Sequence, residues 1–182
     1  MIRAAFLDRD GVINRKPPEG EYITRGEEMQ ILPGVSEAIV RLNEAGFRVI
    51  VVTNQRCVAK GLITTAELEV LHQQLREALA GATIDAIYYC PHEMQPPCLC
   101  RKPQPGMLLD AARAHNIDLA ASWMIGDSDI DIEAGRRAGC KTARLVDSDE
   151  RANGNSDVAA PSLREAIDQI LRESSCDGSR AK

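Results

Sequence analysis

Short runs dominated by apolar residues are the feature of this sequence that most restricts its fold. Five of them are predicted to be strands: residues 4–7, 49–52, 84–89, 123–125 and 142–146. A strand with one face in water alternates apolar and polar residues, whereas a continuous apolar run is typical of a parallel strand that is covered on both faces. The sequence therefore favours a sheet buried between two layers.

Stretches with helical periodicity lie between these runs. Apolar residues recur three and four positions apart over 35–42 and 68–79, and Gly46 ends the first stretch. Thr64 and Glu67 have the spacing of a capping box before the second. Further helices are predicted at three places: around 108–112, around 132–136, and from Ser162 to Leu171. Strands alternating with helices predict an α/β fold, a doubly wound (Rossmann-like), mainly parallel five-stranded sheet with helices on both faces.

The length of 182 residues predicts one domain. We expect this domain to span residues 1–173, with a polar loop at 147–157 and a flexible tail at 174–182. The 27 acidic and 22 basic residues give a net charge of −5, which argues against binding nucleic acid by broad phosphate neutralisation. No apolar run approaches the ~20 residues of a membrane span. No secretory leader precedes Ile2, so a cytoplasmic protein without a membrane partner is expected.

Polar residues follow several of the predicted strands at the point where each strand ends. Asp8 and Asp10 follow the first strand, Thr53 follows the second, and Asp127 follows the fourth. In open α/β sheets, ligands bind at the carboxyl ends of the strands. We therefore expect these side chains to converge on one edge of the sheet.

The first acidic pair, Asp8 and Asp10, lies two residues apart in extended geometry and therefore points to one side. Two neighbouring carboxylates repel each other, and a hard divalent cation such as Mg²⁺ relieves this repulsion. In a functional interpretation, Asp8 is a nucleophile and Asp10 is a general acid/base. The alternative is a turn or helix N-cap that contains two aspartates, and Gly11 fits either interpretation.

The remaining polar motifs each have a structural alternative. Asp127 and Asp131 are four residues apart at a predicted helix start, where they can face one ion, but the helix dipole also favours aspartates there. Thr53 supplies a hydroxyl, although a polar cap after a strand is common. Lys102 supplies a compact positive charge, or else it forms a solvated basic pair with Arg101.

Together these motifs resemble those of the haloacid dehalogenase superfamily, because Asp8-x-Asp10-Gly11, Thr53, Lys102 and Gly126-Asp127-x-x-x-Asp131 occur in that family's order. Longer stretches resemble its heptose-bisphosphate and histidinol-phosphate phosphatase branch: Phe6 to Asn14, Thr53-Asn54-Gln55, Cys90-Pro91-His92, and Cys98 to Met107. The resemblance covers about Ile2 to Val146. It implies a magnesium-dependent phosphatase, and the short connections leave no room for a large cap domain.

The resemblance also implies a role for each motif residue. Asp8 attacks phosphorus to form an aspartyl-phosphate, and Asp10 protonates the leaving oxygen and then activates water. Thr53 and Lys102 stabilise the phosphoryl group. The implied ligands of Mg²⁺ are the Asp8 carboxylate, the Asp10 backbone carbonyl and Asp127. Supporting positions are assigned to two further residues, Asp131 and Ser128.

A Cys90-x-His92-x5-Cys98-x-Cys100 pattern suggests a structural zinc site within a loop at residues 90–100, hereafter the zinc loop. Three thiolates and one imidazole make a closed tetrahedral set for Zn²⁺. The alternative is a group of free cysteines with a surface histidine. A bound zinc would hold the proline-rich loop and orient Arg101 and Lys102. The other cysteines and histidines are interpreted as structural or incidental: Cys57, Cys140, Cys176, His72 and His115.

The expected ligand is a small phosphorylated sugar, bound by a chain that we expect to be a monomer. Candidate recognition residues carry charges or hydrogen-bonding groups near the motifs: Arg15, Lys16, Glu19, Tyr22, Asn54, Gln55, Arg56, Lys60 and Arg101. Any second phosphate should meet some of these cations. Arg56-Cys57 stands where the branch usually has small residues such as Ser-Gly, so the contact with a second phosphate is open.

The implied reaction is hydrolysis of a sugar phosphate, with the 7-phosphate of D-glycero-D-manno-heptose 1,7-bisphosphate as the first candidate. Histidinol phosphate is the alternative substrate. Two non-enzymatic alternatives are a receiver-like phospho-accepting module and an inactive phosphate-binding protein. The zinc motif and Asp10 argue against the receiver, because a receiver must keep its phospho-aspartate. Magnesium-dependent phosphate release separates an enzyme from both.

Overall fold

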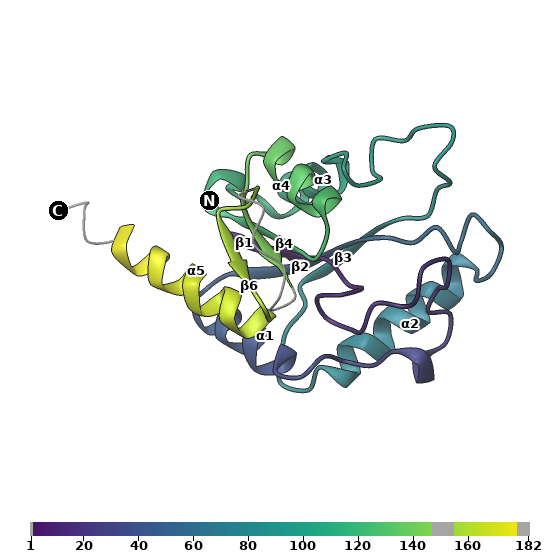
Figure 1. Ribbon diagram of the computed structural model, residues 1–182, viewed down its shortest axis with the longest axis horizontal. Coiled ribbons are helices and arrows are strands. Elements are labelled where there is room, and N and C mark those ends of the chain that lie inside the picture. The colour runs from purple at the N-terminus through teal and green to yellow at the C-terminus, as the bar shows by residue number, and fades with distance from the viewer. Residues whose placement is uncertain (1, 147–154, 178–182) are drawn as a thin grey trace.

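A parallel sheet with the strand order β3-β2-β1-β4-β5-β6 forms the centre of the computed structural model, which describes residues 2–146 and 155–177 (Figure 1). The strands are β1 (Ala4–Leu7), β2 (Arg48–Asn54), β3 (Ala86–Cys90), β4 (Trp123–Gly126), β5 (Lys141–Leu145) and β6 (Val158–Ala160). The helices are α1 (Val35–Glu44), α2 (Thr65–Ala78), α3 (Gly106–His115), α4 (Asp129–Ala138) and α5 (Leu163–Asp177), with 3-10 turns at Gly26–Glu28 and Leu119–Ala121.

Helices cover both faces of the sheet, as the continuous apolar runs predict. On β1, Ala5 and Leu7 face the core cluster that includes side chains of α1 and α5, whereas Ala4 and Phe6 face the cluster built with α3 and α4. All four side chains are fully buried. Figure 1 shows α1, α2 and α5 below the sheet and α3 and α4 above it. The doubly wound, Rossmann-like prediction is confirmed.

The sheet has one strand more than the five that the sequence predicts. Strand β6 pairs in parallel with β5, with Ala143 opposite Val158. Its three residues are too few to show a periodicity. Asp157 holds the start of the strand, because its carboxylate accepts hydrogen bonds from the Thr142 backbone N–H at 2.7 Å and from the Thr142 hydroxyl at 2.8 Å.

The helix starts follow the predicted caps, but the last helix is longer than predicted. Glu67 donates its backbone N–H to the Thr64 hydroxyl at 3.2 Å, which confirms the capping box of α2. Helix α5 continues to Asp177 and so includes four residues of the predicted tail at 174–182. Extending a formed helix adds one hydrogen bond per residue, which offsets the weak helix propensity of Ser174 and Ser175. The rest of that tail and positions 147–154 of the predicted loop lie outside the described residues.

The sheet topology places a ligand crevice between β1 and β4. The chain runs from β1 to β2 on one side and reaches β4 on the other, so the carboxyl ends of β1 and β4 flank a topological switch point. Asp8 and Asp127 directly follow these two strands. Among the described residues, no helix combines the length and apolar character that crossing a bilayer requires.

Candidate active site

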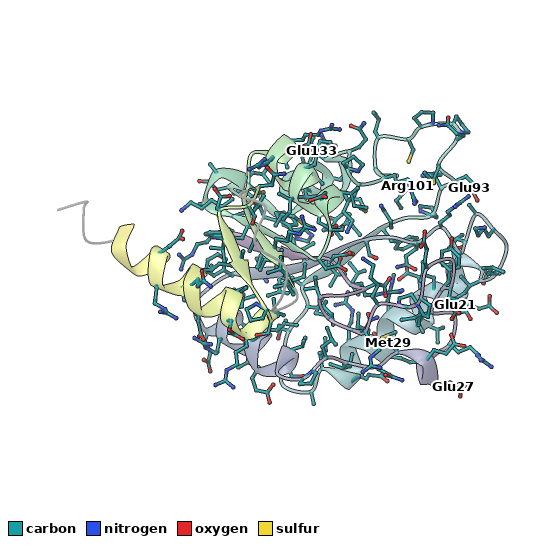
Figure 2. The ribbon with its side chains drawn as sticks, viewed as in Figure 1. Glu21, Glu27, Met29, Glu93, Arg101 and Glu133 are labelled. Carbon is teal, nitrogen blue, oxygen red and sulfur yellow. The ribbon has the colours of Figure 1, made fainter. Side chains whose placement is uncertain are left out.

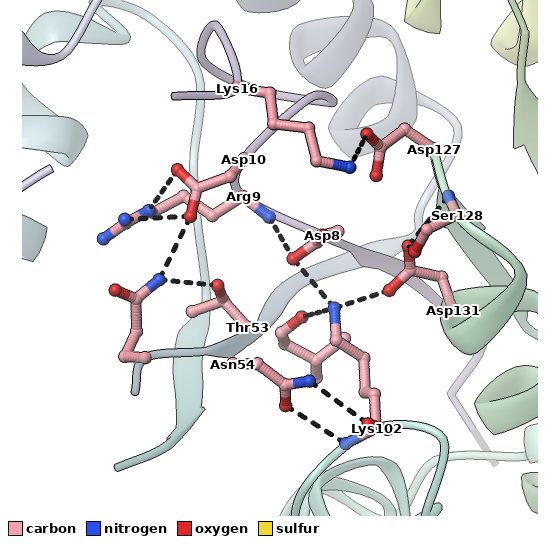
Figure 3. Close-up of polar contacts among 12 residues, drawn as sticks. Asp8, Arg9, Asp10, Lys16, Thr53, Asn54, Lys102, Asp127, Ser128 and Asp131 are labelled. Atoms are coloured by element: carbon pink, nitrogen blue, oxygen red, sulfur yellow. Dashed lines mark hydrogen bonds and ion pairs between the residues drawn. The ribbon is translucent and has the colours of Figure 1, made fainter. Parts of the chain in front are cut away.

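Lys102 lies at the centre of the site and is almost completely buried, with 1% of its side chain exposed. Its ammonium lies 2.8 Å from Asp8 Oδ1 and 2.7 Å from Asp131 Oδ1, and it donates to the Val52 carbonyl at 2.8 Å (Figure 3). These three acceptors match the three N–H groups of the ammonium. The geometry excludes a solvated surface pair for Lys102 and holds its charge beside Asp8.

Asp8 is placed as a carboxylate nucleophile requires. It follows the buried end of β1, and its Oδ1 accepts the Arg9 backbone N–H at 2.7 Å. Burial raises the pKa of Asp8 from 3.8 to about 7; the Lys102 charge opposes this rise, and the charges of Asp131 and Asp10 add to it. Further positive charge at the site favours the ionised form of Asp8.

Three carboxylates form a cluster that fits a hard divalent cation. Oxygen atoms of Asp8, Asp127 and Asp131 lie within 4.8 Å of one another. Asp127 Oδ1 is buried and has no hydrogen-bond partner among the described residues, and such a group is unfavourable unless a cation or water binds it. Asp127 Oδ2 lies 2.6 Å from the ammonium of Lys16. A cation in this cluster would satisfy the buried oxygen, and oxygen ligands are those that Mg²⁺ prefers.

Asp131 is held on both of its oxygens. Oδ1 pairs with Lys102, while Oδ2 accepts the Ser128 backbone N–H at 3.2 Å and also the Ser128 hydroxyl. These contacts form the capping box at the start of α4. Through these contacts Asp131 and Ser128 can orient Lys102, and their supporting role stays a prediction.

Asp10 is surrounded by hydrogen-bond donors. Its carboxylate accepts from Arg9 Nε at 3.1 Å and Nη2 at 3.0 Å (Figure 3). It also accepts from Asn14 Nδ2 at 2.9 Å and from Gln55 Nε2 at 3.2 Å. Burial alone would raise the pKa of Asp10, but the Arg9 charge and these hydrogen bonds outweigh burial and lower it below 3.8. Asp8 and Asp10 thus occupy opposite electrostatic environments within one site.

Sequence reasoning missed the role of Arg9, which is 1% exposed and makes a two-pronged contact with Asp10. The pattern of an arginine between two aspartates is typical of a surface segment, and no periodicity indicates that Arg9 is buried. Asn14 is also buried, and the sequence pattern marks it only as the last residue of the Phe6 to Asn14 motif. For both residues, the only available signal was their position in the Asp8 to Asn14 segment.

The last two residues of β2, Thr53 and Asn54, and the following Gln55 connect the two halves of the site. Thr53 Oγ1 accepts from Gln55 Nε2 at 2.8 Å, and both residues are buried. Asn54 Nδ2 donates to the Lys102 carbonyl at 3.2 Å, and Asn54 Oδ1 accepts the Lys102 backbone N–H at 3.1 Å. The amide of Asn54 therefore holds the main chain of Lys102, although the sequence assigned Asn54 to substrate binding.

A cavity of about 270 Å³ connects these groups. The motif residues that line it lie just after β1 and β4, at the end of β2 and in the segment before α3: Asp8, Asp10, Thr53, Asn54, Gln55, Lys102, Asp127 and Ser128. Its outer wall is the segment 16–23, which includes the predicted recognition residues Lys16, Glu19 and Tyr22. A short loop therefore forms one wall of the cavity.

Other predicted recognition residues lie outside this cavity lining. Arg15 lines a neighbouring cavity, Arg56 Nε pairs with Glu93 at 2.6 Å, and Lys60 lies 6.0 Å from the centre of the Tyr22 ring. Arg101 Nη1 donates to the His92 carbonyl at 3.4 Å. Figure 2 shows Arg101 and Glu93 close together at the zinc-loop end of the molecule.

The four predicted zinc ligands converge. The Sγ of Cys98 lies 3.5 Å from Cys90 Sγ and 3.6 Å from Cys100 Sγ, and His92 Nδ1 lies 3.2 Å from Cys100 Sγ and 3.6 Å from Cys90 Sγ. Ligands about 2.0–2.3 Å from a tetrahedral zinc ion are separated by roughly 3.3–3.8 Å. The cluster can hold a zinc ion, and its sulfur distances are far from the ~2.05 Å of a disulfide. Burial opposes ionisation of Cys98, but hydrogen bonds from the Arg101 backbone and the cluster lower its pKa to about 7, toward the thiolate that zinc binds.

Comparison with known proteins agrees with this geometry. The model of HAD-like hydrolases matches residues 99–167. A D-glycero-beta-D-manno-heptose-1,7-bisphosphate 7-phosphatase of Bordetella bronchiseptica is 42% identical over 141 residues, which are 76% of this chain and 78% of that protein. The chain belongs to this heptose-bisphosphate phosphatase family. A relative with the same description from Pseudomonas aeruginosa is 44% identical over 75% of this chain and 76% of its own length.

A solved structure from the heptose-bisphosphate phosphatase family supports the fold. The D,D-heptose 1,7-bisphosphate phosphatase of B. bronchiseptica, complexed with magnesium and phosphate, has a TM-score of 0.84 and 35% identity. The match covers 94% of this chain and 99% of that one. The haloacid dehalogenase resemblance predicted from the motifs is therefore confirmed.

In this heptose-bisphosphate phosphatase family member, we expect Cys98→Ala to reduce activity by disordering Lys102. The zinc loop ends at Cys100, two residues before Lys102, so loss of one thiolate ligand should loosen the segment that carries the ammonium of Lys102. Metal analysis should show loss of about one zinc per chain, and kcat should fall by about tenfold or more.

The matched control for Cys98→Ala is Cys140→Ala, because Cys140 is buried on the α4–β5 connection, outside the cluster. That variant should keep its zinc and its turnover number. A zinc-free Cys98→Ala protein with wild-type turnover would contradict the link between the zinc loop and Lys102.

Proposed function

We propose that the chain is a magnesium-dependent phosphoric monoester hydrolase that removes the 7-phosphate of D-glycero-D-manno-heptose 1,7-bisphosphate. The observation that carries the proposal is the division of Asp8 and Asp10 between opposite environments in one cavity. Asp8 lies beside Lys102 and the other cluster carboxylates, whereas Asp10 lies among donors. The relatives from B. bronchiseptica and P. aeruginosa are named for this activity.

The first step is attack by Asp8 on phosphorus, with departure of the sugar oxygen and formation of an aspartyl-phosphate. The substrate is anionic, so positive charge must offset its repulsion from Asp8. Lys102 supplies one charge, and the Thr53 hydroxyl supplies a donor. A bound Mg²⁺, held by Asp8, the Asp10 carbonyl and Asp127, would add charge stabilisation at the phosphoryl oxygens.

Asp10 transfers the protons of both steps. The approaching anionic phosphate repels the negative charge of Asp10, so the affinity of Asp10 for a proton rises. Once protonated, Asp10 can protonate the leaving oxygen. The Arg9 pair then favours the carboxylate that remains. In the second step this carboxylate takes a proton from water as the water hydrolyses the aspartyl-phosphate.

The second phosphate of the proposed substrate needs a cation that the first phosphate does not use. Arg101 directly precedes Lys102, and its Nη1 donates to the His92 carbonyl at 3.4 Å. Arg56 is engaged by Glu93 at 2.6 Å, so its pair must open or rearrange before it binds a phosphate. Arg101 is therefore the first candidate for the second-phosphate contact.

A direct comparison of two substrates tests the proposal. With Mg²⁺ present, kcat/KM for phosphate release from D-glycero-D-manno-heptose 1,7-bisphosphate should exceed kcat/KM for histidinol phosphate by about 10²-fold. Only the bisphosphate offers a second phosphate to the candidate cations Arg101 and Arg56. A preference for histidinol phosphate would identify the alternative enzyme. Absence of hydrolysis with both substrates would favour a phospho-accepting or phosphate-binding protein.

We further propose that residues 1–173 act as one catalytic unit, as a monomer in the cytoplasm. All groups of the proposed reaction lie within one chain. The described cysteines are free thiols, including the three of the zinc cluster, which suits a reducing compartment. Size-exclusion chromatography with light scattering tests the monomer, and a dimer would contradict it.

A further inference from the structure

Gln55 has a buried side-chain amide at the lining of the cavity, and the residue is 2% exposed. Its Nε2 donates to Thr53 Oγ1 at 2.8 Å and to Asp10 Oδ2 at 3.2 Å. Its Oε1 accepts from the thiol of Cys57 at 3.5 Å. One side chain thus links a phosphoryl-stabilising hydroxyl, the proposed general acid/base and a core thiol.

The partners of Gln55 select a single orientation of its amide. An ionised carboxylate such as Asp10 only accepts hydrogen bonds, so it must face Nε2. A thiol can donate, so Cys57 faces Oε1. A flipped amide would place Oε1 against the Asp10 carboxylate, where two acceptors repel each other, and would turn Nε2 toward the Cys57 thiol. Cys57 and Asp10 therefore favour the same orientation from opposite ends.

The orientation of Gln55 also determines how Thr53 acts. A hydroxyl has one proton and two acceptor lone pairs. Because Thr53 Oγ1 accepts from Gln55, its own proton remains available for a phosphoryl oxygen in the cavity that Thr53 lines. Asp10 Oδ2 is shared between Gln55 and Arg9, so the same amide also limits rotation of that carboxylate.

The Cys57 thiol, which donates to Gln55, is itself held in place by packing. Cys57 is fully buried in an apolar cluster with Ile63 just before α2, Leu68 in the first turn of α2, and Ile23 of the segment that lines the cavity. Burial raises the pKa of the Cys57 thiol, so it stays protonated and able to donate. The sequence predicts only a structural or incidental thiol at this position, but the Cys57 thiol also donates a hydrogen bond to Gln55.

We propose that Gln55 is a positioning residue that orients the Thr53 hydroxyl and the Asp10 carboxylate, and that Cys57 sets the orientation of its amide. The inference rests on the proposed phosphatase reaction. It assigns Gln55 an effect on the chemical step, in place of the substrate contact expected from the sequence.

Three variants, assayed with D-glycero-D-manno-heptose 1,7-bisphosphate and Mg²⁺, test this role. Gln55→Met keeps the length of the side chain and removes both polar groups, so kcat should fall about tenfold while KM stays within about twofold. Cys57→Ala should lower kcat about threefold without changing KM. Cys57→Ser restores a donor of similar size and should recover most of that kcat.

Thermal unfolding of each variant separates positioning from loss of the fold. A Gln55→Met protein with unchanged kcat and a raised KM would make Gln55 a substrate contact and overturn the inference. Equal losses in Cys57→Ala and Cys57→Ser would indicate packing alone, and wild-type kcat in Cys57→Ala would remove Cys57 from the role. A wild-type protein that hydrolyses neither heptose bisphosphate nor histidinol phosphate would overturn the proposed function and the inference together.

Discussion

Asp8→Asn is expected to lower phosphate release by about 10⁴-fold or more, because the substitution removes the proposed nucleophile. The amide fills the same space beside Lys102 but carries no negative charge and cannot form an acyl phosphate from a carboxylate. The measurement is phosphate release from the heptose bisphosphate at saturating Mg²⁺. Acid-quenched wild-type protein should also contain a phosphorylated aspartate that the variant lacks.

The loss of activity in Asp8→Asn should occur in a folded protein. Lys102 keeps its 2.7 Å pair with Asp131, and burial disfavours the charge of Asp8 in the unliganded site. The unfolding midpoint should therefore stay at or slightly above that of the wild type. Asp110→Asn is the matched control, because Asp110 is exposed on α3 beside Arg113 and should leave turnover unchanged. Wild-type turnover in Asp8→Asn would contradict the proposed mechanism.

The fold could be predicted from the sequence where local patterns decide structure. Ala4 to Leu7 is apolar at every position because both faces of β1 are covered, and Thr64 with Glu67 marks the start of α2. Strand β6 escaped prediction because pairing with β5 and the contacts of Asp157 stabilise its three residues. Such long-range contacts leave no local periodicity.

The proposed catalytic positions could be predicted because they follow strands. Asp8 and Asp127 directly follow β1 and β4, so the topology alone brings them to one crevice. The partners of these residues could not be predicted in the same way. Gln55 contacts Asp10 across 45 positions, and Asn54 contacts Lys102 across 48 positions. These contacts depend on how loops pack.

Lys102→Met is expected to damage both stability and activity. Its ammonium lies between the carboxylates of Asp8 and Asp131, whose side chains are 13% and 0% exposed. Removing the charge leaves two buried carboxylates facing each other, which should lower the free energy of unfolding by about 3–5 kcal/mol. The same change removes charge stabilisation of the phosphoryl group, so kcat should fall about 10²- to 10³-fold.

A double variant separates these two effects of Lys102. Adding Asp131→Asn to Lys102→Met removes one of the two opposed carboxylates, so much of the lost stability should return, while activity should stay low because the ammonium is still absent. Urea unfolding in buffer without magnesium measures the first effect, and phosphate release with magnesium measures the second. A wild-type unfolding midpoint in Lys102→Met would mean that the ammonium does not balance these carboxylates. Recovery of turnover in the double variant would mean that the charge of Lys102 acts on the fold alone and takes no part in the transition state.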